Sequence, residues 1–357
     1  MIRIAYIINS VEGGGAALPV PDVTGVLRRG GAEVQVFALT RRDGRALAPM
    51  EASGLRVTVR DGGERDHLAA LGWLDQQIAA MQPTHLWTSL TRATLLGQLA
   101  GLRRGVPVVS WQHAAYLKPA NRRLLRTLQP LSRLWVGDSD AVTRLTAERL
   151  KVPVRRLMQW SIFRADANAP QAAPWRPGEP VRIGTLGRLH PVKGYDVLID
   201  ALALLPHQAV PIEVSIAGDG AERAALEARA QALGVTSLRF AGYTADPRAY
   251  LAGLHLYVQP SRSEGLCVAA HEAMQAGVPV IASAVGQLPY SIAQGETGMT
   301  VPPGDAPTLA EALSTLLAAP DRLATMGTIA RAQTLDRFGA ERFEAAGLAI
   351  LDRMRGF

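Results

Sequence analysis

The sequence predicts an α/β protein with two domains, each built on a doubly wound parallel sheet. Apolar runs of strand length alternate with amphipathic segments of helix length along all 357 residues, which is typical of parallel βαβ units. The chain is also too long for one typical domain of about 100–200 residues. A stretch rich in proline and alanine at 165–180 interrupts the alternation, which then restarts. We therefore place the domain boundary in that stretch.

The first domain begins with an apolar strand at 2–9 that continues into a glycine-rich segment at 11–17. A glycine turn between a first strand and a helix permits close approach of a ligand to the backbone. Pro19 and Pro21 are awkward for an immediate helix, so we expect this loop to extend to about Asp22. Further strands are expected at 33–39, 55–59, 84–88, 106–111 and 134–138, and helices at 67–81, 92–103 and 139–150.

The second domain repeats the same pattern. Strands are expected at 181–186, 212–217, 238–241, 256–259 and at the end of the stretch 258–283. Helices are expected at 195–205, 221–233, 247–254 and 307–318, with a short helix within 286–298, and a final helix at about 340–354 closes the chain. Ligands of such sheets bind beyond the carboxyl ends of the strands. The loops that follow these strands are therefore the places to search for a site.

The stretch 258–283 carries the clearest chemical signal, because it places two carboxylates around the start of a helix. Glu264 lies in a loop, Gly265 allows a turn, and a helix from about Leu266 would place Glu272 nearly two turns in. The first turn of a helix offers unpaired N–H groups and a positive dipole end, which suit a phosphate. The two carboxylates would then hold the hydroxyls of a nucleotide sugar; without their flanking residues they would be ordinary surface glutamates.

Two cations follow the first strand of the second domain. Arg188 and Lys193 lie on the loop that starts at Gly187, where a planar guanidinium and a compact ammonium could clamp a diphosphate. Only 3 of the 38 cationic side chains are lysines, so a lysine at this place is informative. Glycine turns at Gly218 and Gly242 follow the next two strands.

Charge is distributed unevenly, with a balance of +11 over residues 1–178 and −4 over residues 179–357. Segment 116–135 mixes Leu and Trp with one Lys and four Arg, so it is either a surface for anionic lipid head groups or a solvated basic flank. No recognised nucleic-acid-binding module accompanies the charge. His113 lies just past the strand at 106–111, where a structural and a functional role are equally open.

The sequence disfavours several classes of protein. The single cysteine, Cys267, excludes an internal disulfide and suggests a reducing compartment; we expect it to be a buried core thiol rather than a nucleophile. No signal peptide and no apolar run of about 18 residues is evident, so we expect a cytoplasmic protein. NAD binding is disfavoured, because G-x-G-x-x-G is absent and the strand at 33–39 is followed by Arg41 and Arg42 rather than an acidic residue.

Taken together, the motifs of the second half resemble those of the retaining, GT-B-fold glycosyltransferases of family 4, the group 1 glycosyltransferases. The matching pieces are GRLHPVKG at 187–194, IAGDGAER at 216–223, AGY at 241–243, PSRSEGLCVAAHEAMQAGVPVIAS at 260–283 and GETGMTVPPGD at 295–305. They occur in the family's order and spacing. The first half is similar only through its glycine-rich loop and His113.

The resemblance implies roles for individual residues. Arg188 and Lys193 would neutralise the diphosphate of a nucleotide-sugar donor, Glu264 would contact hydroxyls of the donor sugar, and Glu272 would bind the ribose. His113 would be a further catalytic residue from the first domain. The other donor-binding positions implied are Gly13, Gly14, Gly15, Gly187, Gly218, Gly242, Tyr243, Gly265, Leu266 and Cys267.

The resemblance also implies the domain roles and the reaction. We expect two Rossmann-like domains facing a central cleft: an acceptor-side domain at 1–168, joined by the C-terminal helix at about 338–357, and a donor-binding domain at 178–337. The expected reaction moves a hexose with retention to a saccharide acceptor, lipid-linked, for cell-envelope or exopolysaccharide synthesis at the cytoplasmic membrane face. Neither a metal nor another cofactor is expected. The alternatives are a nucleotide-sugar epimerase or phosphorylase on the same fold, or a non-catalytic relative that binds a nucleotide sugar.

Overall fold

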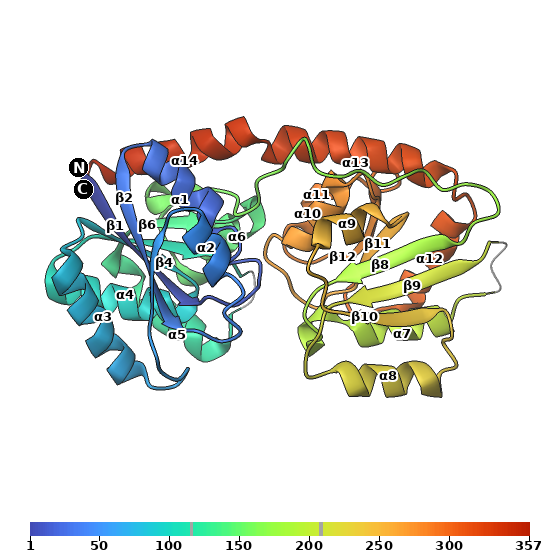
Figure 1. Cartoon of the computed structure of the whole chain (residues 1–357), viewed down its shortest axis with the longest axis horizontal. Helices are drawn as coiled ribbons and strands as arrows, with labels where there is room; N and C mark the ends of the chain where they lie inside the picture. Colours follow the sequence, from blue (N-terminus) through green and yellow to red (C-terminus); the bar gives the residue numbers. More distant parts are fainter. Residues whose placement is uncertain (115–116, 207–209) are drawn as a thin grey trace. The chain divides into compact units, whose positions relative to one another are not determined.

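The computed structural model describes residues 1–114, 117–206 and 210–357. The chain divides into two compact units, the first formed by Met1–Arg164 with Ala340–Phe357 and the second by Ala165–Gly339. Each unit contains a parallel sheet with helices on both faces (Figure 1). This arrangement confirms the predicted fold class.

The sheet of the first unit has the strand order β3-β2-β1-β4-β5-β6-β7, with parallel pairing throughout. Its strands are β1 (Ile2–Ser10), β2 (Ala32–Thr40), β3 (Arg56–Val59), β4 (His85–Ser89), β5 (Val108–Gln112), β6 (Ser132–Gly137) and β7 (Leu157–Gln159). Its α-helices are α1 (Val20–Arg29), α2 (Leu47–Ala52), α3 (His67–Met81), α4 (Thr91–Arg104), α5 (Pro119–Leu128), α6 (Asp140–Leu150) and α14 (Ala340–Met354). Two short 3₁₀ helices, η1 (Gln129–Leu131) and η2 (Val154–Arg156), complete the unit.

The sheet of the second unit has the strand order β10-β9-β8-β11-β12-β13, again parallel throughout. Its strands are β8 (Val181–Leu186), β9 (Ile212–Ala217), β10 (Leu238–Gly242), β11 (Leu256–Gln259), β12 (Val280–Ser283) and β13 (Gly298–Val301). Its helices are the 3₁₀ helix η3 (Pro191–Lys193) and the α-helices α7 (Tyr195–Ala203), α8 (Arg223–Ala232), α9 (Pro247–Ala252), α10 (Val268–Gln275), α11 (Leu288–Ser291), α12 (Ala306–Leu317) and α13 (Arg322–Phe338).

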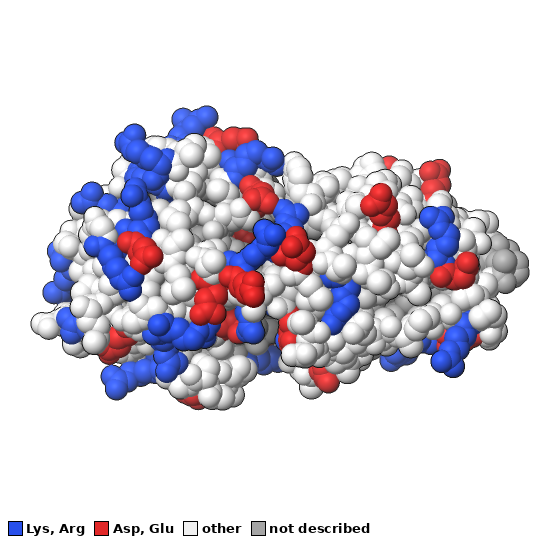
Figure 2. Space-filling model, turned by 90° about the horizontal axis from the view of Figure 1, so that it is seen from above, with Lys and Arg blue, Asp and Glu red and all other residues white. Residues whose placement is uncertain are grey.

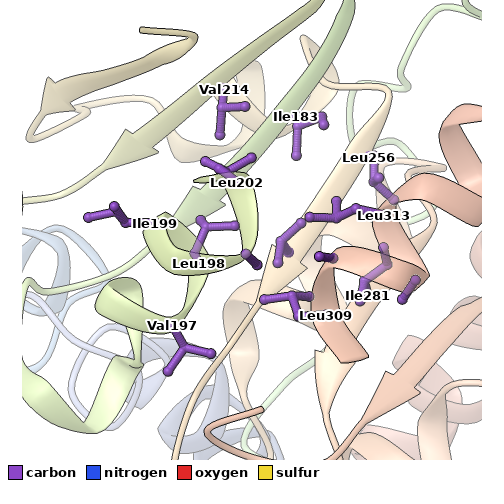
Figure 3. Close-up of a cluster of buried hydrophobic side chains, with 14 of the residues drawn as sticks. Ile183, Val197, Leu198, Ile199, Leu202, Val214, Leu256, Ile281, Leu309 and Leu313 are labelled. Carbon is purple, nitrogen blue, oxygen red and sulfur yellow. The ribbon is translucent and has the colours of Figure 1, made fainter. Parts of the chain in front are cut away.

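Strand β11, in the middle of the second sheet, is buried on both faces because helices cover each side. Successive residues of a strand point to opposite faces, and on β11 the side chains of Leu256 and Val258 enter a core with residues of α7, α8 and α12. Figure 3 shows this core, in which Leu256 of β11 and Leu313 of α12 lie close together and Leu198 and Leu202 enter from α7. Tyr257, between them in sequence, enters the opposite core with residues of α9, α10 and α13. The near-continuous apolar character of the strand follows from this double burial.

The strand order in each unit creates a point where successive crossovers leave in opposite directions. In the first unit this point lies between β1 and β4, and in the second between β8 and β11. The loops that follow the two central strands separate there, which leaves room for a ligand at the carboxyl edge of the sheet. The candidate site of the second unit is therefore bordered by the loops after β8 and β11.

Two local expectations were wrong. The loop after β1 does not extend to Asp22, because α1 already begins at Val20 with Pro21 in its first turn, where proline is tolerated. Helix α10 begins at Val268 and not near Leu266, since Cys267 has a φ of 67°. Glu272 is consequently one turn into α10 rather than two. Elements that the sequence analysis missed are α2, β7, β13 and α13.

Candidate active site

The loop after β8 is held tightly against its neighbours by glycines. The N–H of Gly187 donates to the carbonyl of Ala217 at 2.9 Å, and a Cβ on Gly218 would lie 2.0 Å from the carbonyl oxygen of Gly187. The N–H of Gly218 in turn donates to the carbonyl of Gly242 at 2.6 Å. The predicted glycines at the ends of β8, β9 and β10 are thus in direct backbone contact, and side chains there would force the loops apart.

A second close approach joins the β8 loop to the β11 loop. Gly194 has a φ of 66°, and a Cβ on it would lie 2.0 Å from the carbonyl oxygen of Pro260. The N–H of Arg262 donates to the carbonyl of Val192 at 2.8 Å, and its guanidinium pairs with Asp196 at 2.6 Å. These contacts fix the two loops that border the opening between β8 and β11.

Lys193 and Glu264 meet across this opening. Lys193 Nζ lies 2.8 Å from Glu264 Oε1, with side-chain exposures of 23% and 10%. Burial alone would lower the pKa of Lys193, but the Glu264 carboxylate outweighs burial and raises it. The lysine is therefore a permanent cation, and in the absence of ligand each partner neutralises the other. Arg188 lies exposed on the same loop, between Gly187 and Leu189.

The turn before α10 contains Cys267, which a helix beginning near Leu266 would have included. Cys267 is the residue at the N-cap position, in a left-handed conformation, and its side chain does not cap the helix. The carbonyl of Gly265 accepts the N–H of Gln287 at 2.9 Å, which ties the turn to the segment after β12. The thiol is buried, and burial raises the pKa of Cys267, so it behaves as a core thiol.

Glu272 is a half-buried carboxylate on α10. Burial raises its pKa from 4.5 to about 7, and Arg248 opposes this rise. Within the described part of the chain no hydrogen bond or salt bridge holds the Glu272 carboxylate, since Arg248 pairs with Asp166 at 2.8 Å. A perturbed, unpartnered carboxylate beside a ligand-binding edge is a frequent sign of a functional site. Tyr243, at the end of β10, is 56% exposed.

In the first unit, the loop after β1 contains Gly13, Gly14 and Gly15. The N–H of Gly13 donates to Asp43 Oδ1 at 2.9 Å, and the carbonyl of Gly14 accepts the N–H of Ala17 at 3.1 Å. A Cβ on Gly14 would meet no atom within 4 Å. Nothing in the chain itself therefore requires glycine at this position, which agrees with a loop that leaves room for a ligand.

His113 lies between two polar residues, Ser89 and Asp138, at the ends of neighbouring strands. Its Nε2 is 2.8 Å from Ser89 Oγ, at the end of β4, and its Nδ1 is 3.5 Å from Asp138 Oδ2, just after β6. The side chains of His113 and Asp138 are 7% and 3% exposed. Burial raises the pKa of Asp138, and the neighbouring His113 opposes that rise. Sequence analysis singled out His113 but missed Ser89 and Asp138.

The basic segment 116–135 forms α5 and the elements after it, except that Tyr116 lies outside the described residues. Helix α5 buries Leu125, whereas Arg122, Arg123 and Arg126 are exposed and Leu124 is 50% exposed. A different face of this unit, seen in Figure 2, also carries more Lys and Arg than Asp and Glu. Among the described helices, none has the length and apolar character needed to cross a bilayer.

Comparison with known proteins identifies the family. The profile of the family described as glycosyl transferases group 1 matches residues 170–333. A D-inositol 3-phosphate glycosyltransferase of Gordonia bronchialis is 30% identical, over 90% of this chain and 80% of that protein. The chain belongs to the group 1 glycosyltransferases. The lipopolysaccharide core biosynthesis glycosyltransferase LpsE of Rhizobium meliloti is 32% identical, over 44% of each protein.

Solved structures of this fold confirm the architecture of the glycosyltransferase. HepE of Anabaena, crystallised with UDP-glucose, superimposes with a TM-score of 0.85 over 99% of this chain and all of that chain, at 21% sequence identity. The predicted family, the GT-B fold and the enzyme class are therefore confirmed. In the described residues no group of three or more His, Cys, Asp or Glu side chains is arranged to hold a metal ion; a metal-free reaction stays a prediction.

Proposed function

We propose that this glycosyltransferase moves a hexose from a nucleotide-diphosphate sugar to a saccharide acceptor with retention at the anomeric carbon. One observation carries the proposal: Lys193 and Glu264 pair at 2.8 Å in the opening between β8 and β11. A cation and a carboxylate at this edge suit the two ends of one donor, the diphosphate and the sugar hydroxyls. The second unit, Ala165–Gly339, would bind the donor, and the first would bind the acceptor.

The donor contacts follow from the chemistry of each group. The ammonium of Lys193 and the guanidinium of Arg188 would neutralise the diphosphate, while the N–H groups at Leu266 and Cys267 would meet the phosphate next to the sugar. Glu264 would accept hydrogen bonds from sugar hydroxyls and Glu272 from the ribose. The turn at 242–243 would border the base.

The reaction then depends on stabilising the leaving group. The bond between the anomeric carbon and the phosphate oxygen breaks, and its electron pair stays on the nucleoside diphosphate. The acceptor hydroxyl forms the new bond on the same face, and its proton passes to the departing phosphate. Preorganised cations lower the energy of this charge as it develops. These steps would require neither a nucleophilic side chain of the protein nor a metal ion.

Two features support an acceptor at a membrane. The exposed arginines and Leu124 on α5 form a basic amphipathic surface, which suits anionic head groups. Curated relatives include a lipopolysaccharide core glycosyltransferase and a phosphatidylinositol monomannoside mannosyltransferase that is GDP-mannose-dependent. We therefore propose that the protein is a peripheral enzyme of cell-envelope or exopolysaccharide synthesis that acts on a lipid-linked saccharide at the cytoplasmic face of the membrane.

Calorimetric titration tests the proposal. UDP, GDP and ADP, with their glucose and mannose conjugates, are titrated into the wild-type chain and into the Lys193→Ala and Glu272→Ala variants. One nucleoside diphosphate should bind the wild-type chain, and both variants should lose that binding. Incubation of the selected donor with saccharide acceptors should give a product of retained anomeric configuration by NMR. Absence of binding by every compound, or a product of inverted configuration, would refute the proposal.

A further inference from the structure

Glu264 is held by a buried chain of side chains that begins on β11. Tyr257 Oη donates to Gln259 Oε1 at 2.7 Å, and Gln259 Nε2 donates to Ser261 Oγ at 2.7 Å. Ser261 Oγ donates to Glu264 Oε1 at 2.7 Å, and Gln259 Nε2 also donates to that oxygen at 3.2 Å. Tyr257, Gln259 and Ser261 are completely buried. Three donors, with Lys193 as the third at 2.8 Å, thus converge on one carboxylate oxygen.

The direction of these hydrogen bonds is fixed by the ionised Glu264. A carboxylate only accepts, so the proton of Ser261 must point to Glu264, and Ser261 must accept from Gln259. The amide of Gln259 then has to present its NH₂ group to Ser261 and Glu264 and its carbonyl to Tyr257. The opposite amide orientation would place a carbonyl oxygen against the carboxylate. In this amide orientation every donor of the chain faces an acceptor. The hydrogen bonds of such a chain polarise and so strengthen one another.

Tyr257 also connects this chain with the loop of the phosphate-binding cations. Its hydroxyl accepts the N–H of Leu186, the last residue of β8, at 3.2 Å. The carbonyl oxygen of Leu186 lies 3.2 Å from the same hydroxyl, but Gln259 Oε1 at 2.7 Å is the nearer acceptor for its one proton. Leu186 directly precedes Gly187 and Arg188. Because β8 is held in the sheet by its pairing with β9 and β11, its end anchors the buried hydroxyl that contacts the Gln259 amide. No other tyrosine hydroxyl of the described residues is hydrogen-bonded to Gln259.

We propose that Tyr257 and Gln259 are positioning residues of the glycosyl transfer, which orient the Glu264 carboxylate toward the donor sugar through the Gln259 amide. The inference rests on the proposed role of Glu264 at the sugar. It predicts that loss of either residue affects the sugar end of the donor and spares the nucleotide end, since the hydrogen bonds of the two side chains run to Glu264, to Ser261 and to the end of β8 rather than to Glu272.

The first experiment compares two tyrosine hydroxyls. Tyr257→Phe removes the hydroxyl that holds Gln259. Tyr250→Phe is the matched control, because Tyr250 Oη bonds to Ser215 Oγ at 2.9 Å and to the carbonyl of Thr185 at 3.1 Å without touching Gln259. We expect Tyr257→Phe to reduce kcat by about 10-fold or more, since small misplacements near the reacting atoms cost up to about 100-fold. Tyr250→Phe should retain kcat within about 2-fold.

The second experiment separates positioning from general loosening of the fold. Gln259→Met keeps the length of the side chain but removes the amide. Calorimetry should show that the nucleoside diphosphate (UDP, GDP or ADP) binds both variants with wild-type affinity, while the glucose conjugate loses the extra affinity that its sugar supplies. Because both residues act through one chain, the double variant should lose no more kcat than Gln259→Met alone, whereas Tyr250→Phe with Gln259→Met should be additive.

Variants of Ser261 test whether its hydroxyl is needed and whether a replacement hydroxyl restores kcat. Ser261→Ala should reduce kcat, whereas Ser261→Thr keeps the hydroxyl and should restore it. The inference is overturned if Tyr257→Phe and Tyr250→Phe have the same kcat, or if Gln259→Met weakens the nucleoside diphosphate and its glucose conjugate equally. A wild-type chain that binds none of the nucleotides would instead refute the proposed function, and the positioning role with it.

Discussion

Ser89 and His113 share a hydrogen bond of 2.8 Å between Ser89 Oγ and His113 Nε2, which joins the ends of two neighbouring strands. The other ring nitrogen faces Asp138 Oδ2 at 3.5 Å. An ionised Asp138 favours a proton on Nδ1, so Nε2 would accept from Ser89. Ser89 is completely buried, and the arrangement therefore orients the imidazole rather than exposing a serine nucleophile.

Replacement of Asp138 by asparagine should exchange the tautomer of His113. The asparagine amide can donate to Nδ1, which moves the proton to Nε2 and reverses the bond with Ser89. Long-range ¹H–¹⁵N spectra at pH 8 should show Nδ1–H in the wild-type chain and Nε2–H in Asp138→Asn. We expect kcat to fall by at least about 10-fold, because a wrong tautomer is costly where a histidine acts on substrate. Protonation of the same nitrogen in both proteins would contradict this account.

Lys193→Ala should damage both stability and nucleotide binding. Glu264 is 10% exposed, so loss of its counter-ion leaves a nearly buried charge, at a cost of about 1–3 kcal/mol in the free energy of unfolding. The affinity for a nucleoside diphosphate should fall by about 10- to 100-fold, since a charge-assisted bond to phosphate is lost. Urea denaturation and calorimetry measure the two effects.

The control for Lys193→Ala is Arg29→Ala, which breaks an exposed pair with Glu344 at 3.0 Å. An exposed pair contributes little to stability, and Arg29 lies on α1 of the first unit rather than on the loops after β8 and β11. Equal losses of nucleotide affinity in the two variants would show that removal of any positive charge has this effect, and would exclude a direct contact between Lys193 and the nucleotide.

The alternation of strands and helices was predictable because parallel strands are buried on both faces. Helix α13 was not recognised, and its sequence explains why. The face that it buries includes Gly327, Ala330, Arg331 and Thr334, so the stripe of large apolar residues that identifies a helix is interrupted. Gly327 is needed because a Cβ would lie 1.8 Å from the carbonyl oxygen of Gly277. Such tertiary contacts leave no periodic signal in the sequence.

Some residues of the candidate site were likewise predictable from the sequence and others were not. Lys193 and Glu264 were predictable from motif and spacing, and the structure brings them together. The sequence did not predict the roles of Tyr257, Gln259 and Ser261. These residues alternate along the end of a strand and look like ordinary strand and loop residues. Their partnership depends on the path that the chain takes after β11, which no local pattern encodes. The conformation of Cys267 was not predictable either, because a positive φ, here 67°, is unusual for a residue other than glycine.

The basic surface of α5 should direct binding to anionic membranes. Each arginine near an anionic surface contributes about 1 kcal/mol. Reversal of Arg122, Arg123 and Arg126 to glutamate should therefore weaken partitioning onto phosphatidylserine-containing vesicles by roughly 100-fold at low salt. Leu124→Ser should weaken it further, because that side chain is 50% exposed.

Vesicle sedimentation at low and at high salt measures the effect of α5. A control variant with the same change in net charge replaces the exposed Arg322, Arg342 and Arg353 with glutamate. Equal partitioning of the wild-type chain onto neutral and anionic vesicles would exclude the membrane surface. Equal losses in the two triple variants would show that net charge, and not α5, determines binding.

Glu272 should make both stability and donor binding depend on pH. Its pKa is raised from 4.5 in an ordinary glutamate to about 7 by burial, so the folded state favours the protonated form. The stability that this provides is complete below pH 4.5 and is lost as the pH rises through 7. Glu272→Gln removes this titration, so the variant should gain stability relative to the wild-type chain as the pH rises. Between pH 5 and pH 8, the free energy of unfolding of the variant minus that of the wild-type chain should increase by about 1–3 kcal/mol.

Nucleotide affinity should change in the opposite sense, because the ionised Glu272 is the better acceptor for ribose hydroxyls. In the wild-type chain the affinity for the selected nucleoside diphosphate should rise between pH 6 and pH 8, the interval around the pKa of about 7. In Glu272→Gln it should be lower and nearly independent of pH, whereas Glu311→Gln, on the exposed side of α12, should behave as the wild-type chain. A pH dependence that persists in Glu272→Gln would mean that another group titrates, and it would remove Glu272 from the ribose contact.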